Sequence, residues 1–251
     1  MELDIAELST GIDARLRVVP RLTTEQVRVI RREFTARLRA ATPEAILELA
    51  ERLLAMPSLL PGNGWGPAMP FLRRFFAYEL VANHRATLAS LDAARLEALG
   101  HEIASWEAVD TFCLYLAGPV WRERQVSDDL IRSWAASPNR WWRRAALVST
   151  VPLNSQARGG RGDTARTLAT CSLLVEDRDD MVVKALSWAL RELAKRDAHA
   201  VRGFLETYQE VLATRVLREV RNKLATGLKH PRRRAADPEP TNVSDADGAP
   251  G

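Results

Sequence analysis

The apolar residues of this 251-residue chain recur at intervals of three and four positions along almost its whole length. That spacing gathers them on one face of an α-helix, and the strict alternation of a half-buried β-strand is missing. Two helices are especially well marked. TTEQVRVIRREFTARLRAA begins with a threonine cap, and TPEAILELAERLLAM begins with Thr42 followed by Pro43 at the first helical position. The pattern therefore predicts an all-helical fold.

Three stretches interrupt this periodicity. Residues 56–70 hold several Pro and Gly and predict a loop, after which FLRRFFAYELVANHRATLASL resumes the helical pattern. A second, Gly-rich break falls at residues 153–164. From about Lys229 the chain loses its apolar residues and gains Pro, Gly, Asp and Ser. We expect one folded domain over residues 1–228 and a disordered tail over 229–251.

Weak internal repetition lies between these breaks. Residues 139–150 align with residues 179–190 at a spacing of 40, which pairs Arg144 with Lys184, Ala145 with Ala185 and Val148 with Trp188. That spacing is typical of stacked helix pairs of the HEAT and armadillo kind. In such an α-solenoid the second helix of each pair lines a concave surface, where extended ligands bind. An ordinary amphipathic bundle also gives partial matches of this sort.

Composition places the chain among intracellular globular proteins. It is 46% hydrophobic and 27% charged, and its net charge of +4 suits a polyanion binder only if the excess is concentrated on one surface. Cys113 and Cys171 each sit in an apolar run, which indicates buried thiols rather than a disulfide or a zinc site. The four histidines lack metal-ligand spacing, and neither a spanning helix nor a signal peptide is evident. We expect a cytoplasmic protein without a membrane segment.

The stretch SWEAVD raises the first question of chemistry. Ser105 is placed to cap a helix, on which Trp106 and Asp110 are four residues apart and therefore share one face. A half-buried core tryptophan beside a solvated carboxylate is the commoner explanation of such a pair. An aromatic face beside an anion is the alternative, and it would suit a ligand that becomes positively charged.

Two further stretches combine arginine or lysine with tryptophan. RWWRRAAL sets Arg140 one turn before Arg144 and adds Arg143, while KALSWALRELAK places Lys184, Trp188 and Arg191 close together on one helix. A guanidinium fits a phosphate, and an indole packs on a sugar or a base, so the mixture favours nucleic-acid contact. Tryptophans that face the core, with arginines merely exposed, explain the same pattern about as well.

Taken in order, these motifs resemble a known family. W-E-A-V-D at 106–110, W-W-R-R-A-A-L at 141–147 and K-A-L-S-W-A-L-R-E at 184–192 resemble the HEAT-like-repeat alkylpurine DNA glycosylases, the AlkD-like DNA alkylation repair enzymes. The likeness covers roughly residues 25 to 225. It has no recognisable counterpart to the family's first helical segment, and the breaks at 56–70 and 153–164 are also foreign to it.

The resemblance implies a monofunctional enzyme that hydrolyses the N-glycosidic bond of N3- or N7-alkylated purines in duplex DNA. It implies Asp110 as the catalytic carboxylate, Trp106 and Trp188 as the aromatic walls of the cleft, and Arg144 as a phosphate contact. Arg143 is the rival for that last role, since the tandem arginines allow a slip of one residue. The further DNA-binding candidates are Arg140, Lys184 and Arg191. A monomer without metal or organic cofactor is expected.

The chemistry of the residues agrees with those roles. An alkylated purine already carries positive charge and leaves easily, so help is needed by the oxocarbenium-like sugar and by the attacking water. A carboxylate near C1′ serves both, and indole faces stabilise the developing cation. One alternative is a non-catalytic repeat protein that binds distorted DNA or RNA. Another is a protein-interaction scaffold, which predicts no salt-dependent DNA affinity.

Two basic stretches lie outside these motifs. The break at 153–164 carries Arg158 and Arg161 and is followed by Arg166, and a plain surface loop is favoured there over a mobile clamp on DNA. HPRRR, at the start of the tail, is favoured as a solvated charge run, since acidic residues that follow largely offset it.

Overall fold

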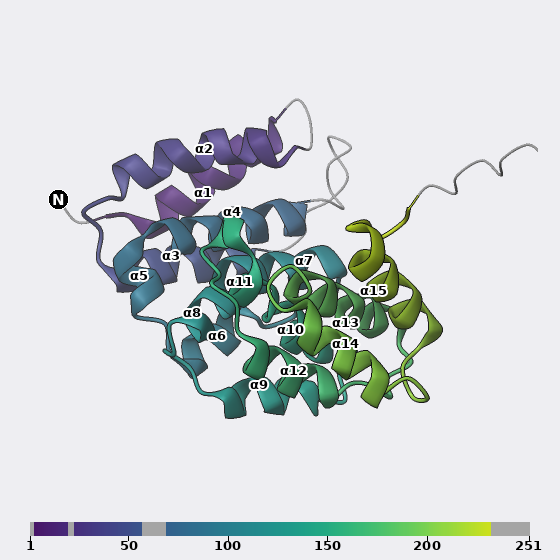
Figure 1. Ribbon diagram of the computed structural model, residues 1–251. Helices are drawn as coiled ribbons and strands as arrows, with labels where there is room; N and C mark the ends of the chain where they lie inside the picture. The colour runs from purple at the N-terminus through teal and green to yellow at the C-terminus, as the bar shows by residue number, and fades with distance from the viewer. Residues whose placement is uncertain (1–2, 20–22, 57–68, 232–251) are drawn as a thin grey trace, which may run out of the picture.

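The computed structural model describes residues 3–19, 23–56 and 69–231, and every regular element in these ranges is helical. Figure 1 shows the helices in chain order. They are α1 (Ile5–Arg17), α2 (Thr24–Arg37), α3 (Pro43–Ala55), α4 (Met69–Asn83), α5 (Arg85–Ala89), α6 (Ala93–Leu99), α7 (Trp106–Phe112), α8 (Gly118–Arg122), α9 (Asp128–Ala135), α10 (Arg140–Val148), α11 (Val151–Asn154), α12 (Thr164–Ser172), α13 (Asp180–Leu193), α14 (Ala198–Thr207) and α15 (Thr214–Thr226). A π-helical turn at Cys113–Ala117 joins α7 to α8, and a 3-10 turn spans Gln156–Arg158.

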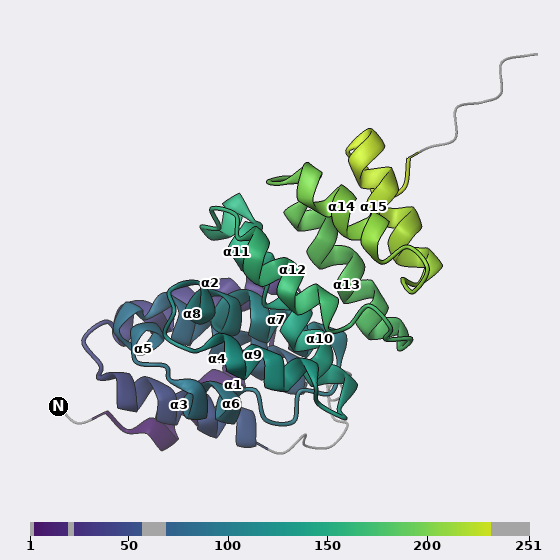
Figure 2. The ribbon, with the colours of Figure 1, turned by 60° about the horizontal axis from the view of Figure 1, so that its bottom comes forward.

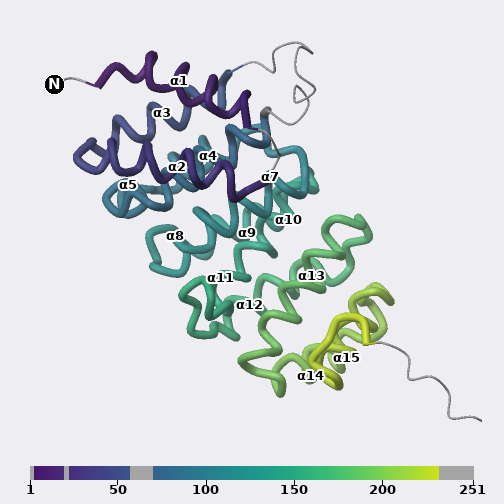
Figure 3. The backbone as a smooth tube through the Cα atoms, turned by 90° about the horizontal axis from the view of Figure 1, so that it is seen from above, coloured from purple at the N-terminus to yellow at the C-terminus, as the bar shows by residue number. Residues whose placement is uncertain are grey.

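The helices stack in two layers, as expected for a helical-repeat solenoid. In one layer, hereafter the second-helix layer, each member contacts the next in the order α2, α4, α7, α10, α13, α15. In the other layer α1 packs on α3, α3 on α5 and α6, and α9 on α12. Figures 2 and 3 show the chain advancing along one direction, with α1 and α15 near opposite ends. The predicted all-helical repeat architecture is confirmed.

Side-chain caps explain where many of these helices begin. Thr23 and Thr42 accept hydrogen bonds from backbone N–H groups in the first turns of α2 and α3, and Pro43 opens α3, as the sequence predicts. Ser105 caps α7 by accepting from the N–H of Ala108. An additional helix, α1, is capped by Asp4 and precedes the first helix that the sequence marked clearly. The N-terminal portion is therefore a helix pair, α1 and α2, which pack together.

The core runs continuously between the layers. The buried rings of Phe112 and Trp134 form a cluster with the partly buried ring of Trp142, and the Trp134 and Trp142 centroids are 4.9 Å apart. Both cysteines are buried free thiols, and burial raises their pKa. None of the helices within the described ranges is long and apolar enough to cross a membrane.

The predicted loop at 56–70 lies almost entirely in residues 57–68, outside the described residues, and α4 already begins at Met69. The helical stretch that follows is broken at His84, which caps α5.

A break lies within the predicted range of 153–164, between α11, which ends at Asn154, and α12, which begins at Thr164, and it is held against the body. Gly160 donates its backbone N–H to Ser155, and a Cβ on Gly160 would meet the Pro152 carbonyl oxygen at 2.5 Å. Arg158 donates to the Leu114 carbonyl and lies over the Tyr115 ring. Arg166, at the start of α12, likewise lies over Trp121. These contacts favour a structural loop over a DNA clamp.

The chain beyond α15 remains attached to the body for several residues. Lys229 accepts a hydrogen bond at its carbonyl from Asn222, and its ammonium lies 3.4 Å from Glu219. The counter-charge for Lys229 is the buried carboxylate of Glu219, which the sequence does not reveal. Residues 232–251, with most of the HPRRR run and the rest of the predicted tail, lie outside the described residues.

Candidate functional site

Three helices of the second-helix layer present their polar residues in one register. Their N-caps are Ser105 for α7, Asn139 for α10 and Asp179 for α13. The fifth residue after each cap is Asp110, Arg144 and Lys184, respectively. Because neighbouring helices of this layer are in contact, the shared register brings these three side chains to one hollow.

That hollow, hereafter the α7–α13 pocket, brings together residues of all three sequence motifs. It is lined by Trp106, Asp110, Arg144, Met181, Lys184, Trp188, Arg191 and Lys229. Six of these were singled out by their motifs. Met181 and Lys229 were not, because a methionine at a helix start and a lysine at the edge of a tail carry no signal of their own.

Asp110 and Arg144 form a nearly buried ion pair at the base of the pocket. Arg144 donates from Nε and Nη2 to the two carboxylate oxygens, each at 2.9 Å, and from Nη1 to the Met181 carbonyl at 2.6 Å. Only 6% of the Arg144 side chain and 14% of the Asp110 side chain are exposed. A guanidinium engaged in this two-pronged way fixes the plane of the carboxylate as well as its position.

The surroundings of Asp110 act on its pKa in opposite directions. Burial penalises the ionised form and raises the pKa, whereas the hydrogen bonds and charge of Arg144 lower it. The net pKa lies above the ordinary value for an aspartate, with Glu107 adding a small like-charge contribution. Such a carboxylate is a better proton acceptor than a solvated one.

The two tryptophans differ in how much they contribute to the fold. Trp106 begins α7 and is 51% exposed, which is unusual for so large an apolar side chain. Trp188, on α13, is partly buried against the core. Both line the pocket that holds Asp110, so the pattern of an indole beside an anion is present in space as well as in sequence.

The basic residues of the pocket lie mainly on α13. Lys184 is paired with Asp180 at 2.6 Å, and Arg191 donates from Nε to Ser187 at 3.2 Å. The pKa of Arg191 is lowered by burial despite the nearby carboxylates of Glu219 and Glu192. Lys184, Arg191 and Lys229 therefore give one wall of the pocket a positive character.

The remaining candidates of the RWWRR motif are used elsewhere. Arg143 donates to Asp177 at 2.7 Å and to the carbonyls of Ser137 and Pro138, which binds α10 to the turns beside it. Arg140 pairs with Asp179 at 3.4 Å and lies over the Trp141 ring. Since neither residue lines the α7–α13 pocket, Arg144 is the arginine of this motif that the fold brings to the site.

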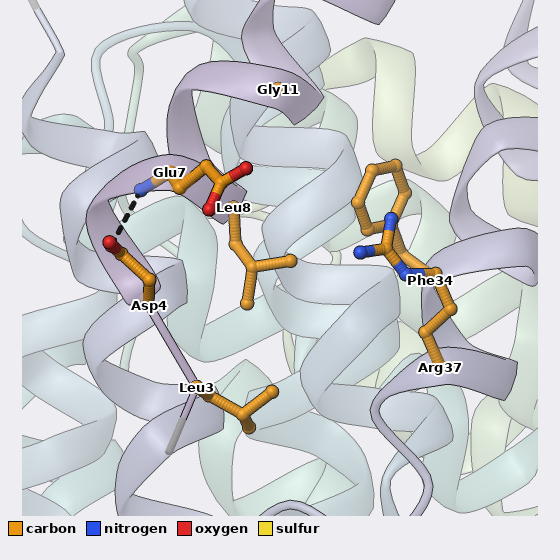
Figure 4. Close-up of a pocket in the computed structure, with 7 residues that line it drawn as sticks. All are labelled: Leu3, Asp4, Glu7, Leu8, Gly11, Phe34 and Arg37. Atoms are coloured by element: carbon orange, nitrogen blue, oxygen red, sulfur yellow. Dashed lines mark hydrogen bonds between the residues drawn. The ribbon is translucent and has the colours of Figure 1, made fainter. Parts of the chain in front are cut away.

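A second hollow lies at the N-terminal end, between α1 and α2, and is shown in Figure 4. Asp4 is occupied as the cap of α1, where it accepts from the N–H of Glu7, and Arg37 lies over the Phe34 ring. These polar groups already serve the local fold, and neither of the described carboxylates that line this hollow, Asp4 and Glu7, is paired with a buried cation. The α7–α13 pocket is therefore the stronger candidate.

Comparison with known proteins adds one finding. A family model described as DNA alkylation repair enzyme matches residues 73–224, which is more than half of the chain. The match includes α7, α10 and α13, and begins well after the N-terminal limit of about residue 25 expected from the motifs. Comparison with the curated proteins and with the solved structures gave no significant match.

Proposed function

The chain belongs to the DNA alkylation repair enzyme family, and we propose that it is a monofunctional DNA glycosylase that releases N3- and N7-alkylated purines from duplex DNA. One observation carries the proposal most directly. A carboxylate of raised pKa, fixed by a buried arginine, lies in a pocket lined by two tryptophans. No metal or organic cofactor takes part in the proposed reaction.

The proposed reaction is a hydrolysis at C1′ of the deoxyribose. The bond from C1′ to the purine nitrogen breaks, and its electron pair neutralises the positive charge of the alkylated base. Water then bonds to C1′ and loses a proton, which leaves an abasic sugar and a neutral free base. The sugar passes through an oxocarbenium-like state, so the barrier falls where an anion stands close to C1′.

Asp110 is the residue we assign to that task. Its negative charge stabilises the cationic sugar, and its raised pKa makes it suited to orient water and accept the proton. The leaving group needs no acid, because it departs as a neutral molecule. A single carboxylate is therefore sufficient for this substrate class.

Arg144 is best assigned as a positioning residue for Asp110 rather than as a phosphate contact. Three of its nitrogens already bind the carboxylate and the Met181 carbonyl, and the side chain is almost entirely buried. A phosphate would have to compete with this pair. The helix register shared with Asp110 and Lys184 brings Arg144 to the pocket, but the partner of its guanidinium there is the carboxylate of Asp110.

Trp106 and Trp188 are assigned to the sugar. An indole face attracts a cation, and the attraction grows as the sugar becomes positive, so it lowers the energy of the transition state more than that of the ground state. The exposed face of Trp106 is available for such contact. We propose that the protein acts on DNA as a monomer.

The test uses duplex DNA that contains N7-methylguanine and measures release of the free base. The wild-type protein should release the base. Asp110→Asn should retain DNA binding but release the base at least about 100-fold more slowly. Asp13→Asn, which alters an ion pair far from the pocket, is the matched control. Equal rates for all three proteins, or release by none, would exclude the proposed activity.

A further inference from the structure

The chain turns back on itself after α15 and reaches the α7–α13 pocket. Gly227 ends the helix with a φ of +74°, a left-handed conformation that a glycine adopts without strain. Thr226 accepts the backbone N–H of Leu228 at its hydroxyl, and Asn222 donates to the Lys229 carbonyl. This turn is thus held by side chains of α15, and it delivers Lys229 to the pocket lining.

One buried carboxylate, that of Glu219, lies beside two of the three cations that line this pocket, Arg191 and Lys229. Glu219, on α15, is 2% exposed, and its Oε2 accepts a hydrogen bond from Ser187 at 2.6 Å. The same oxygen lies 3.4 Å from the Lys229 ammonium and 3.9 Å from Nε of Arg191. Glu219 therefore sets the positions of two cations that come from different segments of the chain.

The charges around the pocket do not cancel locally. Asp110 is matched by Arg144, Lys184 by Asp180, and Glu192 by Lys195. Glu219 provides a single negative charge behind Lys229 and Arg191, so one positive charge remains in excess. Both residues line the pocket, and the Lys229 side chain is 39% exposed and that of Arg191 is 18% exposed, so both remain partly accessible. A wall of this kind attracts an anion to the edge of the pocket.

We propose that Lys229 and Arg191, held by Glu219, bind a backbone phosphate of the DNA strand at the rim of the α7–α13 pocket. The inference rests on the proposed function and deepens it, because it extends the site past residue 224, where the family match ends. In this arrangement the sugar faces Asp110 while an adjacent phosphate is held on the α13–α15 side. A free alkylated nucleoside lacks that phosphate and is expected to be a poor substrate.

Lys229→Gln tests the proposal, with Arg221→Gln as the matched control. Arg221 is also on α15, but it lines a different hollow formed with α14, so its removal changes the net charge equally without touching the site. Binding of a duplex with one N7-methylguanine is followed by fluorescence anisotropy over a series of salt concentrations. Lys229→Gln should weaken binding roughly 5- to 30-fold and reduce the slope of log K against log salt by about 1.

Further variants separate a DNA contact from a structural one. Lys229→Arg should keep the wild-type salt slope, because it keeps the charge. If Lys229→Gln lowers the melting temperature but leaves the slope equal to that of Arg221→Gln, Lys229 is merely the partner of Glu219 and the proposal is overturned. If the wild-type protein itself binds DNA without salt dependence, the proposed function fails first. If the wild-type protein binds DNA and releases the base, and Lys229→Gln has the wild-type DNA affinity and salt slope, this inference alone is rejected.

Discussion

Two ion pairs of aspartate with nearly buried arginine, in different regions of the molecule, look alike but behave differently. In the N-terminal region Asp13 of α1 binds Arg73 of α4 at 2.7 Å and Arg17 of its own helix at 2.7 Å. In the pocket, Asp110 of α7 binds Arg144 of α10. Arg73 is 2% exposed and Arg144 is 5% exposed, so burial of the arginine does not distinguish them.

The carboxylates respond in opposite directions. The pKa of Asp13 is lowered, because hydrogen bonds from two arginines outweigh its burial. The pKa of Asp110 is raised, because desolvation by burial outweighs the hydrogen bonds and charge of its one arginine. A buried ion pair alone is therefore no sign of a reactive site. The difference lies in how many cations surround the acid and whether a pocket opens beside it.

Exchanging each aspartate for asparagine should separate the two roles most clearly. Asp110→Asn is expected to slow base release by about 10²- to 10⁴-fold, since it removes the charge that stabilises the sugar cation. Asp13→Asn is expected to leave release by the folded protein unchanged, but to lower the free energy of unfolding by about 3–5 kcal/mol. Single-turnover kinetics and urea unfolding measure the two effects. If fully folded Asp13→Asn also lost base release, the two aspartates would not differ in role.

Conservative changes of the two arginines should sharpen the comparison. Arg144→Lys keeps the charge but loses the two-pronged contact, and misplacement of Asp110 is expected to slow release by about 100-fold. Because Arg144→Lys keeps the charge, the phosphate role is tested with Arg144→Gln, whose salt slope of DNA binding should stay at the wild-type value. Arg73→Lys is the control and should alter stability only. A slope reduced by about one unit in Arg144→Gln would restore the phosphate role.

The tryptophans of the two environments should respond in opposite ways. Trp106→Ala is expected to slow base release about 10-fold through loss of cation–π stabilisation, with little loss of stability because the ring is half exposed. Trp142→Ala removes a ring from the core cluster and is expected to cost about 3–5 kcal/mol of stability. Thermal unfolding and base release are measured on both variants. A strongly destabilised Trp106→Ala would show that this ring belongs to the core.

Acid pH should produce the smallest effect, with opposite signs in the two regions. The stability that Asp13 contributes is present above its unfolded pKa and is lost as pH falls through its lowered folded pKa. Asp110 has the opposite effect, because the folded protein becomes more stable as pH falls through the raised folded pKa of this residue. Base release declines over the same range, because the carboxylate is protonated. Unfolding free energies of wild type, Asp13→Asn and Asp110→Asn between pH 7 and pH 3 check this. As pH falls, the unfolding free energy of wild type relative to Asp13→Asn should decrease. Its unfolding free energy relative to Asp110→Asn should increase.

Helix caps could be predicted from the sequence, because they depend on residues close together in the chain. Ser105, Thr23 and Thr42 cap helices by accepting from backbone N–H groups three residues later, so their roles follow from sequence alone. The repeat of 40 residues likewise paired Arg144 with Lys184, and both reach the pocket. Glu219 and Lys229 gave no such signal, because each acquires its role from a partner on another segment.

The sequence by itself determined the helices, the stacking of their pairs and the register that carries Trp106, Asp110, Arg144 and Trp188 to one layer. These depend on periodicity and on caps, which are short-range properties. The tertiary structure alone decided what each charge faces. The guanidinium fork of Arg144 fits a phosphate and a carboxylate equally well, and the aspartate that occupies it lies 34 residues away along the chain and 2.9 Å away in space. Burial and partners are set when the helices pack, so the chemistry of a charged residue is fixed at that point.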